Sequence, residues 1–214
     1  QQYFAIRDIV ARVKETDAPG RRRGGIVWHT QGSGKSLTMV MLARALALDP
    51  DIRNPRIVLV TDRVDLDKQL GNTFAACGLS PDRAESGRHL MELVGDQRAH
   101  IVTTLVQKFD KAMNFKKYSD DSPDIFVLVD ETQRTQLGGY SARMRQMFPR
   151  ACYIGFTGTT LLKREKSNVQ KFSGIIHTYA ITQTVADADI GHRLARGSLG
   201  ELQPNQAQVG VWCR

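Results

Sequence analysis

Residues 26–36 read Ile-Val-Trp-His-Thr-Gln-Gly-Ser-Gly-Lys-Ser. An apolar run leads into a glycine-rich turn, and Lys35-Ser36 opens a stretch of helical apolar spacing that continues to about Ala47. The order of strand, glycine-rich loop and helix is the context that a phosphate-binding loop requires. In such a loop, backbone N–H groups surround the phosphate oxygens, and the positive end of the helix dipole adds to their attraction. The stretch therefore predicts a nucleoside triphosphate site.

The polar residues of this loop have separate expected roles. Lys35 is expected to reach the β- and γ-phosphates, and the Ser36 hydroxyl is expected to ligate Mg²⁺. The remaining loop residues are expected to contact phosphate: Gln31, Gly32, Ser33 and Gly34. One position departs from the strict motif, because His29 stands where a glycine belongs, five residues before Gly34. A glycine-rich loop that binds no nucleotide is the alternative.

Composition indicates one globular domain with a basic balance. The 214 residues are 41% apolar, and no apolar run approaches the roughly 18 residues of a membrane span. The three cysteines lack Cys-x-x-Cys spacing and the histidines lack ligand spacing, so we expect a cytoplasmic protein without a metal site of that kind. The net charge of +8 suits nucleic acid, and solvated surface charge explains it equally well. The chain opens at Gln1 rather than Met, so we expect a piece of a longer protein.

Strand and helix patterns alternate along the chain without hairpin signals. Five apolar runs are typical of buried parallel strands. The first begins at residue 26, and the others occupy 56–61, 100–104, 125–129 and 151–156. Helical spacing of apolar residues covers 1–14, 36–47, 64–74, 87–94, 105–113 and 140–148. Asp62 stands where a cap of the helix at 64–74 belongs. This alternation predicts an α/β fold with a doubly wound parallel sheet.

Two further motifs follow strands of this sheet. The run at 125–129 ends in Asp130 and Glu131; one carboxylate there can hold Mg²⁺, and its neighbour can orient and deprotonate an attacking water. Acid pairs after a strand also act simply as caps, and the phosphate loop upstream favours the catalytic interpretation. The run at 151–156 is followed by Thr157-Gly158-Thr159, which offers hydroxyls and a flexible backbone beside the γ-phosphate, or is an ordinary turn. Ligands of such sheets bind at the carboxyl ends of the strands, so we expect these motifs to meet.

Five stretches together resemble the restriction (R) subunit of type I restriction–modification enzymes, which is similar to superfamily 2 helicases. They are His-Thr-Gln-Gly-Ser-Gly-Lys-Ser (29–36), Val-Thr-Asp-Arg-Val-Asp-Leu-Asp-Lys-Gln-Leu (60–70), Thr-Thr-Leu-Val-Gln-Lys-Phe (103–109), Gly-Gly-Tyr-Ser-Ala-Arg-Met (138–144) and Tyr-Ile-Gly-Phe-Thr-Gly-Thr (153–159). The resemblance covers about residues 1–186. It implies an α/β P-loop NTPase fold, RecA-like, with helices on both faces of a parallel sheet: the first lobe of an ATP-driven motor that moves along double-stranded DNA. It also implies ATP and Mg²⁺ as cofactors, and the modification and specificity subunits as partners of the intact parent.

The resemblance assigns roles residue by residue. Gln2 matches the adenine-reading glutamine, Lys35 and Ser36 belong to motif I, and Asp130 and Glu131 to motif II, with Ser36 and Asp130 on the metal. The catalytic set is Lys35, Asp130 and Glu131. Motif III, which couples the ATP state to DNA, is Thr157, Gly158 and Thr159. The implied DNA-backbone contacts, which carry no base preference, are Thr61, Arg63, Thr103, Thr104, Gln107 and Lys108.

The chain departs from the family pattern in three places. Thr132 and Gln133 replace the Ala and His that usually follow Asp-Glu, and Gln hydrogen-bonds like a neutral His but cannot titrate. Thr160 stands where the family usually has Pro, which loosens a turn. Residues 187–214 leave the pattern, and we expect them to form an aberrant tail that does not pack on the lobe, as in a truncated gene product.

Two other functions fit parts of the pattern. A small P-loop kinase would need an arginine-rich lid and an acceptor pocket, and the sequence indicates neither. A non-catalytic nucleotide- or DNA-binding module remains open for this chain by itself. We expect the isolated chain to be inactive in ATP hydrolysis, although its parent family consists of ATP hydrolases and type I site-specific deoxyribonucleases.

Overall fold

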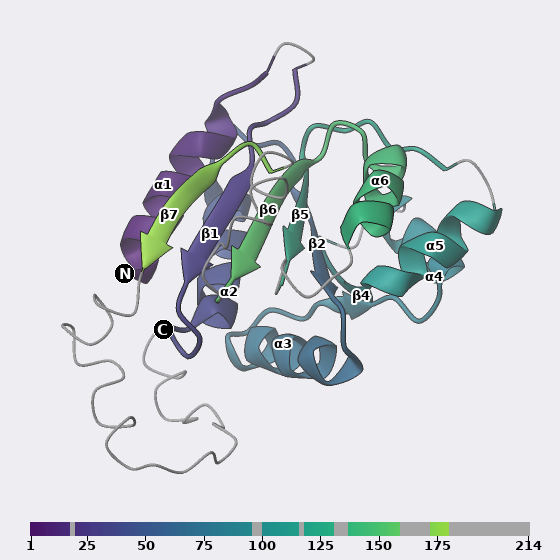
Figure 1. Ribbon diagram of the computed structural model, residues 1–214, viewed down its shortest axis with the longest axis horizontal. Helices are drawn as coiled ribbons and strands as arrows, with labels where there is room; N and C mark the ends of the chain where they lie inside the picture. Colours follow the sequence, from purple (N-terminus) through teal and green to yellow (C-terminus); the bar gives the residue numbers. More distant parts are fainter. Residues whose placement is uncertain (18–19, 96–99, 116–117, 131–136, 159–171, 180–214) are drawn as a thin grey trace.

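A single sheet with helices on both faces makes up the described part of the chain (Figure 1). The structure is a computed structural model that describes all residues except 18–19, 96–99, 116–117, 131–136, 159–171 and 180–214. The strands are β1 (Gly25–His29), β2 (Arg56–Thr61), β3 (Asp82–Arg83), β4 (Ile101–Leu105), β5 (Ile125–Val129), β6 (Cys152–Thr157) and β7 (Ile175–Tyr179). The helices are α1 (Gln2–Lys14), α2 (Lys35–Leu48), α3 (Val64–Ala76), α4 (Gly87–Gly95), α5 (Val106–Phe115) and α6 (Leu137–Met147).

The seven strands of this sheet run in the order β3-β4-β2-β5-β6-β1-β7, and every pair of neighbours is parallel. All residues of β2, β5 and β6 are buried, as their unbroken apolar runs predict. The five predicted strands are present within a residue or two of their expected bounds. The edge strands β3 and β7 are additional to that prediction.

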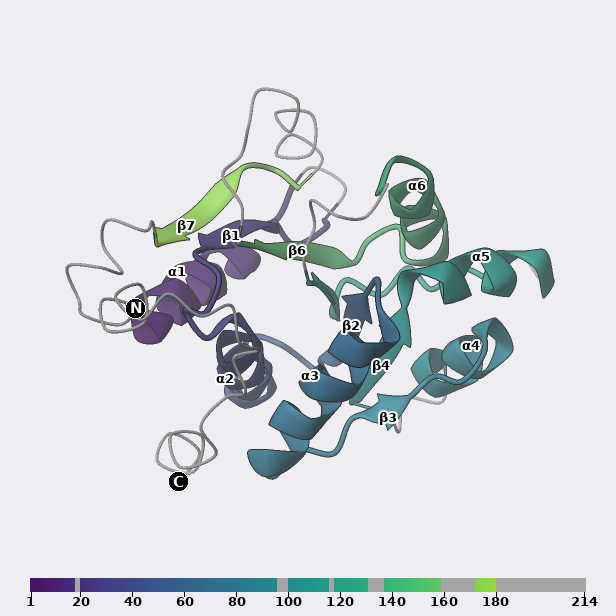
Figure 2. The same ribbon diagram turned by 60° about the horizontal axis from the view of Figure 1, so that its bottom comes forward.

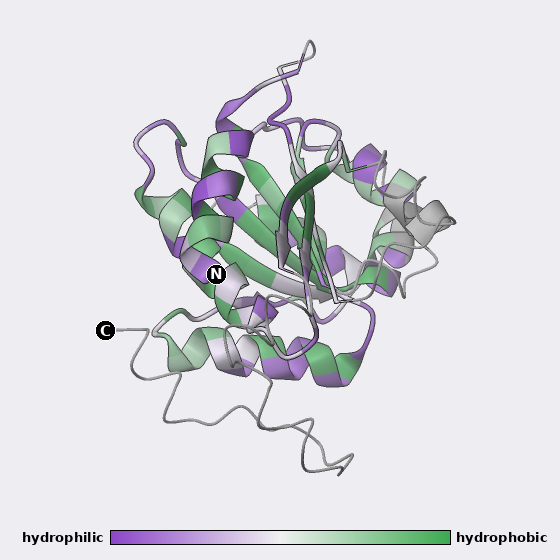
Figure 3. Cartoon of the chain, turned by 60° about the vertical axis from the view of Figure 1, so that its left-hand side comes forward, coloured by the Kyte–Doolittle hydropathy of each residue, from purple (hydrophilic) through white to green (hydrophobic). Residues whose placement is uncertain are grey.

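The helices divide between the two faces of the sheet. Alternate residues of β5 point to opposite faces, so Phe126 and Leu128 join one core with α1, α2 and α3, and Val127 and Val129 join another with α4, α5 and α6. Figure 2 shows α1, α2 and α3 in a row along one face. In Figure 3 the strands are mainly green, the colour of hydrophobic residues, and purple residues lie on the outer sides of the helices. None of the helices in the described residues is long and apolar enough to cross a membrane.

The predicted cap of α3 is wrong. The helix begins at Val64 with Arg63 as its N-cap, and no side chain caps it. Asp62 lies one residue too early for its carboxylate to reach the free N–H groups of the first turn. Its Oδ1 is instead buried without a hydrogen-bond partner in the described residues.

Candidate nucleotide site

The strand order brings the three predicted motifs to one edge of the sheet. Strands β5, β6 and β1 are neighbours in the order given above. The glycine-rich loop follows β1, Asp130 follows β5, and Thr157 is the last residue of β6. Because all three strands are parallel, their carboxyl ends face the same way, and the motifs meet as expected.

Two glycines of the loop adopt a conformation that other residues rarely take. Gly32 and Gly34 both have a φ of 83°, and Gly34 is the N-cap of α2. A Cβ atom added at Gly34 would lie 2.9 Å from the Nε2 of Gln2. A Cβ atom added at Gly32 would meet no atom within 4 Å, so this part of the loop borders open space. The loop therefore leaves room on one side for a ligand.

Contacts from both ends of the described chain hold the loop. The Nε2 atoms of Gln1 and Gln2 both donate to the carbonyl of Ser33, at 3.1 and 3.0 Å. The Ser33 hydroxyl donates to the Thr30 carbonyl at 2.6 Å, and the Thr30 hydroxyl donates to the Tyr179 carbonyl of β7 at 2.9 Å. Gln2, a predicted nucleotide residue, thus lies at the loop. Gln1 lies there too, and only its place next to Gln2 in the sequence could have indicated its contact.

Lys35 and Gly158 lie close together. The Lys35 residue is only 9% exposed. A Cβ atom added at Gly158 would lie 2.9 Å from Lys35 Nζ and 3.3 Å from the backbone nitrogen of Gln31. The missing side chain at 158 therefore gives the Lys35 ammonium its place between the loop and the end of β6.

The other predicted nucleotide residues lie in or near this edge. Ser36 is half-buried in the first turn of α2, and Gln31 is exposed. Asp130 is half-buried and its backbone N–H donates to the Val60 carbonyl at 2.9 Å, while Thr157 is buried. Several positions of the motifs fall outside the described residues: Glu131, Thr132, Gln133, Thr159 and Thr160. Their roles stay predictions.

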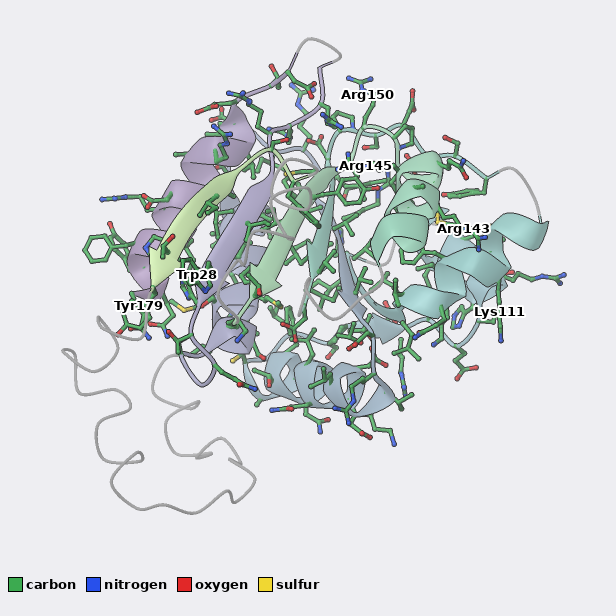
Figure 4. The ribbon with its side chains drawn as sticks, in the orientation of Figure 1. Trp28, Lys111, Arg143, Arg145, Arg150 and Tyr179 are labelled. Atoms are coloured by element: carbon green, nitrogen blue, oxygen red, sulfur yellow. The ribbon has the colours of Figure 1, made fainter. Side chains whose placement is uncertain are left out.

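His29, the departure from the strict motif, pairs with a histidine far along the chain. It is fully buried, and its Nε2 lies 2.9 Å from the Nδ1 of His177 on β7. Burial, with smaller contributions from His177, Lys35 and the N-terminal ammonium, lowers the pKa of His29 to about 4. Burial also lowers the pKa of His177. Figure 4 shows Trp28 and Tyr179 near the same ends of β1 and β7. No local pattern indicated His177, which is 148 residues away from its partner.

The predicted DNA contacts divide into buried and exposed side chains. Thr61, Thr103 and Thr104 are buried. The hydroxyls of Thr61 and Thr104 donate, at 3.4 Å, to the backbone carbonyls of Arg63 and Leu105. In this conformation the three threonine side chains do not form part of a contact surface.

The remaining three lie at the starts of α3 and α5. The Arg63 side chain is 55% exposed and its Nη2 lies 3.6 Å from the Asp65 carboxylate. Gln107 is exposed and donates to the Asp62 carbonyl at 3.2 Å. Lys108 is half-buried, its ammonium donates to the Ala84 carbonyl, and burial lowers its pKa. These donors thus follow β2 and β4, the two strands that come after β5 on the side of the sheet away from β6 and β1.

The sequence matches a described family and several longer proteins. The family model described as SWI2/SNF2 ATPase matches residues 1–212. The chain is 32% identical over 206 residues to the Type I restriction enzyme HindI endonuclease subunit of Haemophilus influenzae, a match that covers 87% of this chain and 20% of that protein. The chain spans about a fifth of the length of the curated relatives it matches.

Solved structures share the fold. A nuclease-deletion mutant of the Type ISP restriction-modification enzyme LlaGI, in complex with a DNA substrate mimic, has a TM-score of 0.63 at 15% identity, covering 92% of this chain and 22% of that chain. The Pyrococcus furiosus Hef helicase domain has a TM-score of 0.59 at 16% identity, covering 84% of this chain and 37% of that chain. The predicted RecA-like α/β P-loop fold is confirmed.

Proposed function

The chain belongs to the SWI2/SNF2 ATPase family and to the family of type I restriction enzyme endonuclease subunits, and we propose that it is the ATP-binding motor lobe of such a subunit. Family membership implies nucleotide binding. We propose ATP as the nucleotide, with Gln2 at its base and Mg²⁺ at its phosphates. In the intact parent, the proposed activity is ATP-dependent translocation on double-stranded DNA with endonuclease cleavage, carried out with the modification and specificity subunits.

The proposed lobe comprises residues 1–186, and residues 187–214 are proposed to form a tail that does not pack on it. The described part of this lobe ends at Tyr179 in β7, so the tail lies outside the described residues. The names of curated relatives support the assignment to a restriction subunit, because they are endonuclease subunits of type I enzymes about five times as long as the matched segment.

The loop chemistry fits Mg-ATP. Lys35 places a positive charge beside Gly158 and the start of the loop at Gln31, and the open space at Gly32 leaves room for the phosphates. Ser36, in the first turn of α2, and Asp130, directly after β5, offer the oxygen ligands that Mg²⁺ prefers. Bound Mg²⁺ would neutralise charge on the phosphates. Glu131 is proposed to orient the attacking water, and Thr157, Gly158 and Thr159 to relate the nucleotide state to DNA binding.

One observation carries this proposal, namely the fit of the Lys35 ammonium against Gly158. The residue is 9% exposed, and the absence of a side chain at position 158 keeps its ammonium at the end of β6, beside the backbone of the glycine-rich loop. The position next to a left-handed glycine N-cap supplies the backbone donors for an anion.

Calorimetric titration with Mg-ATP tests the proposal. Lys35→Ala is expected to weaken binding by about 10- to 100-fold, because a hydrogen bond to a charged group contributes about 1.5–3 kcal/mol. Lys68→Ala removes the same charge from an exposed position of α3 and should leave the affinity within about twofold. Equal affinities of wild type and Lys35→Ala would contradict the assignment of the loop.

DNA binding is proposed to be independent of sequence and sensitive to salt. The exposed Arg63 and Gln107, the half-buried Lys108 and the net charge of +8 support contacts with the phosphate backbone. Contacts through Thr61, Thr103 and Thr104 would need their backbone groups or a rearrangement of β2 and β4. A titration of double-stranded DNA at rising salt should show steep weakening, because phosphate contacts release counterions. A flat salt response would contradict the proposal.

A further inference from the structure

Asp67 is a charged residue in the interior of the lobe. It lies on α3, and its side chain is 0% exposed. Its Oδ2 accepts a hydrogen bond from the Nε of Arg83 at 2.7 Å, and its Oδ1 is buried with no hydrogen-bond partner in the described residues. A buried carboxylate is costly unless a positive charge compensates it. The Asp67 carboxylate therefore holds the Arg83 guanidinium in place, and the charge of Arg83 in turn offsets the cost of burying that carboxylate.

Arg83 itself remains partly open to solvent. It lies on the edge strand β3, and its side chain is 44% exposed. Only Nε is used by Asp67, which leaves the four N–H donors of the two Nη atoms. Among the described residues, no other acceptor takes a hydrogen bond from this guanidinium. A planar fork of donors, held at one side and exposed at the other, suits an anion with several oxygens.

The position of Arg83 places it beside the proposed DNA contacts. Arg83 pairs in register with Thr103, and the backbone N–H of the next residue, Ala84, donates to the Thr103 carbonyl at 2.9 Å. The same Ala84 carbonyl accepts from the Lys108 ammonium. Figure 2 shows β3 at the sheet edge, between α3 and α4. The proposed DNA contacts Arg63, Gln107 and Lys108 follow β2 and β4. Arg83 thus adds a further donor on the next strand, the edge strand β3.

We propose that Arg83 contacts a phosphate of bound DNA, and that the buried carboxylate of Asp67 positions it for this contact. The inference rests on the proposed DNA binding. Because Asp67 already orients the guanidinium, little side-chain entropy is lost when the phosphate binds. Asp67 itself repels the DNA weakly, because its charge is paired and covered.

A charge-neutral double variant tests the contact. Asp67→Asn with Arg83→Gln removes one charge of each sign, so the net charge of the chain stays at its wild-type value, and two neutral amides replace the ion pair. If Arg83 binds a phosphate, affinity for a short double-stranded DNA at 0.1 M salt falls about eightfold, and the slope of log K against log salt becomes shallower by about 0.9. Fluorescence anisotropy of labelled DNA at several salt concentrations measures both.

The matched control is Asp51→Asn with Arg53→Gln. It is also charge-neutral, and both residues are exposed in the turn before β2. This turn lies at the amino end of that strand, whereas the proposed DNA contacts lie at the carboxyl ends of the strands. Its DNA affinity should stay within about twofold of wild type, and its slope of log K against log salt within about 0.2. Thermal melting and Mg-ATP titration show that each double variant is folded.

The single substitution Asp67→Asn separates positioning from simple charge. Removing a negative charge near DNA tightens binding if only net charge matters, whereas loss of positioning weakens it. We expect binding at least threefold weaker and a shallower salt slope, although the removal of a negative charge makes the chain more positive by one unit. Asp65→Asn, on the exposed side of the same helix, should leave binding unchanged or tighter.

The outcomes are distinguishable. Salt-dependent binding by wild type with an unchanged Asp67→Asn/Arg83→Gln variant overturns the inference and leaves the proposed function standing. Tighter binding by Asp67→Asn overturns the positioning role. If wild type does not bind DNA at low salt, the proposed function fails first, and the inference fails with it.

Discussion

The Nε2 of His29 lies 2.9 Å from the Nδ1 of His177, and this contact joins the strand that leads into the phosphate loop to the edge strand β7. The Thr30 backbone N–H and hydroxyl both donate to the Tyr179 carbonyl, at 3.1 and 2.9 Å. The position of the loop therefore depends on β7. With the pKa of both imidazoles lowered, neutral rings share this contact at physiological pH, one donating and one accepting.

The first prediction concerns acid stability. Unfolded His29 gains a proton below about pH 6.5, and folded His29 only below about pH 4. Between these values the unfolded state binds more protons, so the free energy of unfolding falls as the pH falls. From pH 8.0 to pH 5.0 we expect His29 to account for a loss of about 2 kcal/mol, measured by urea denaturation.

The comparison that isolates this effect uses His29→Gln. The variant should lose less stability than wild type over the same pH interval, by about the same 2 kcal/mol. His100→Gln, at an exposed position before β4, should follow the wild-type curve. Parallel curves for wild type and His29→Gln would show that protonation of His29 does not destabilise the fold.

Local patterns predicted most of the fold because the central strands are buried on both faces. Such strands have unbroken apolar runs, and β2 and β5 show them clearly. The edge strands were not predicted for the opposite reason. β3 has two exposed residues, and only Tyr179 of β7 is buried, so both owe their strand state to pairing with β4 and β1 rather than to their own composition.

The candidate site could be predicted where a motif is local and not where it depends on distant contacts. The glycine-rich loop carries its geometry in consecutive residues, whereas the contacts of Ser33 with Gln1 and of His29 with His177 join segments far apart in sequence. Residue type also fails to give orientation. Adjacent threonines of β4, Thr103 and Thr104, are both buried because helices cover both faces of that strand.

The second prediction uses Gly158→Ala. The new Cβ would lie 2.9 Å from Lys35 Nζ and 3.3 Å from the backbone nitrogen of Gln31. The flexible lysine can move and the loop needs to shift by only a few tenths of an ångström, so the fold should lose less than about 1 kcal/mol. The displaced ammonium no longer meets the phosphates as well, and we expect Mg-ATP affinity to fall about tenfold in calorimetry.

Gly71→Ala is the matched control for that substitution. A Cβ there meets nothing within 4 Å, in the interior of α3. The change should leave ATP affinity unaltered and raise the free energy of unfolding by about 0.5–1 kcal/mol, because alanine is the better helix former. A Gly158→Ala variant with wild-type affinity would mean that Lys35 does not need its observed position.

The third prediction concerns the ion pair of Arg56, the first residue of β2, and Asp120, which precedes β5. It lies at the amino ends of these strands, away from the candidate nucleotide site. Arg56 donates to both carboxylate oxygens, at 2.6 and 3.2 Å, and the side chains are only 8% and 18% exposed. Asp120→Ala leaves the guanidinium buried without its carboxylate and should cost about 2–4 kcal/mol in urea denaturation. Asp121→Ala, at the exposed neighbour, should change stability by less than about 0.5 kcal/mol. Equal stabilities of the two variants would contradict this assignment.

The fourth prediction is that the 214-residue chain, purified alone, hydrolyses ATP negligibly, with or without DNA. The described residues form one sheet with one nucleotide edge, and superfamily 2 motors, which the sequence resembles, close that edge with a second lobe. An arginine from the facing surface stabilises charge on the γ-phosphate and contributes about 10³–10⁵ in rate in P-loop enzymes. Losing about 4 kcal/mol of that stabilisation lowers the rate roughly a thousandfold.

A phosphate-release assay checks this, with Glu131→Gln as the control for contaminating ATPases, because that change removes the proposed water-orienting carboxylate. We expect both proteins to release phosphate at the same background rate, while Mg-ATP still binds to each in calorimetry. Restoring the family's residues with Gln133→His and Thr160→Pro should not raise the rate, since the role proposed for those positions is to relate the nucleotide state to DNA, and neither residue supplies an arginine charge at the γ-phosphate. DNA-stimulated release by wild type that Glu131→Gln abolishes would show instead that this lobe is sufficient for catalysis.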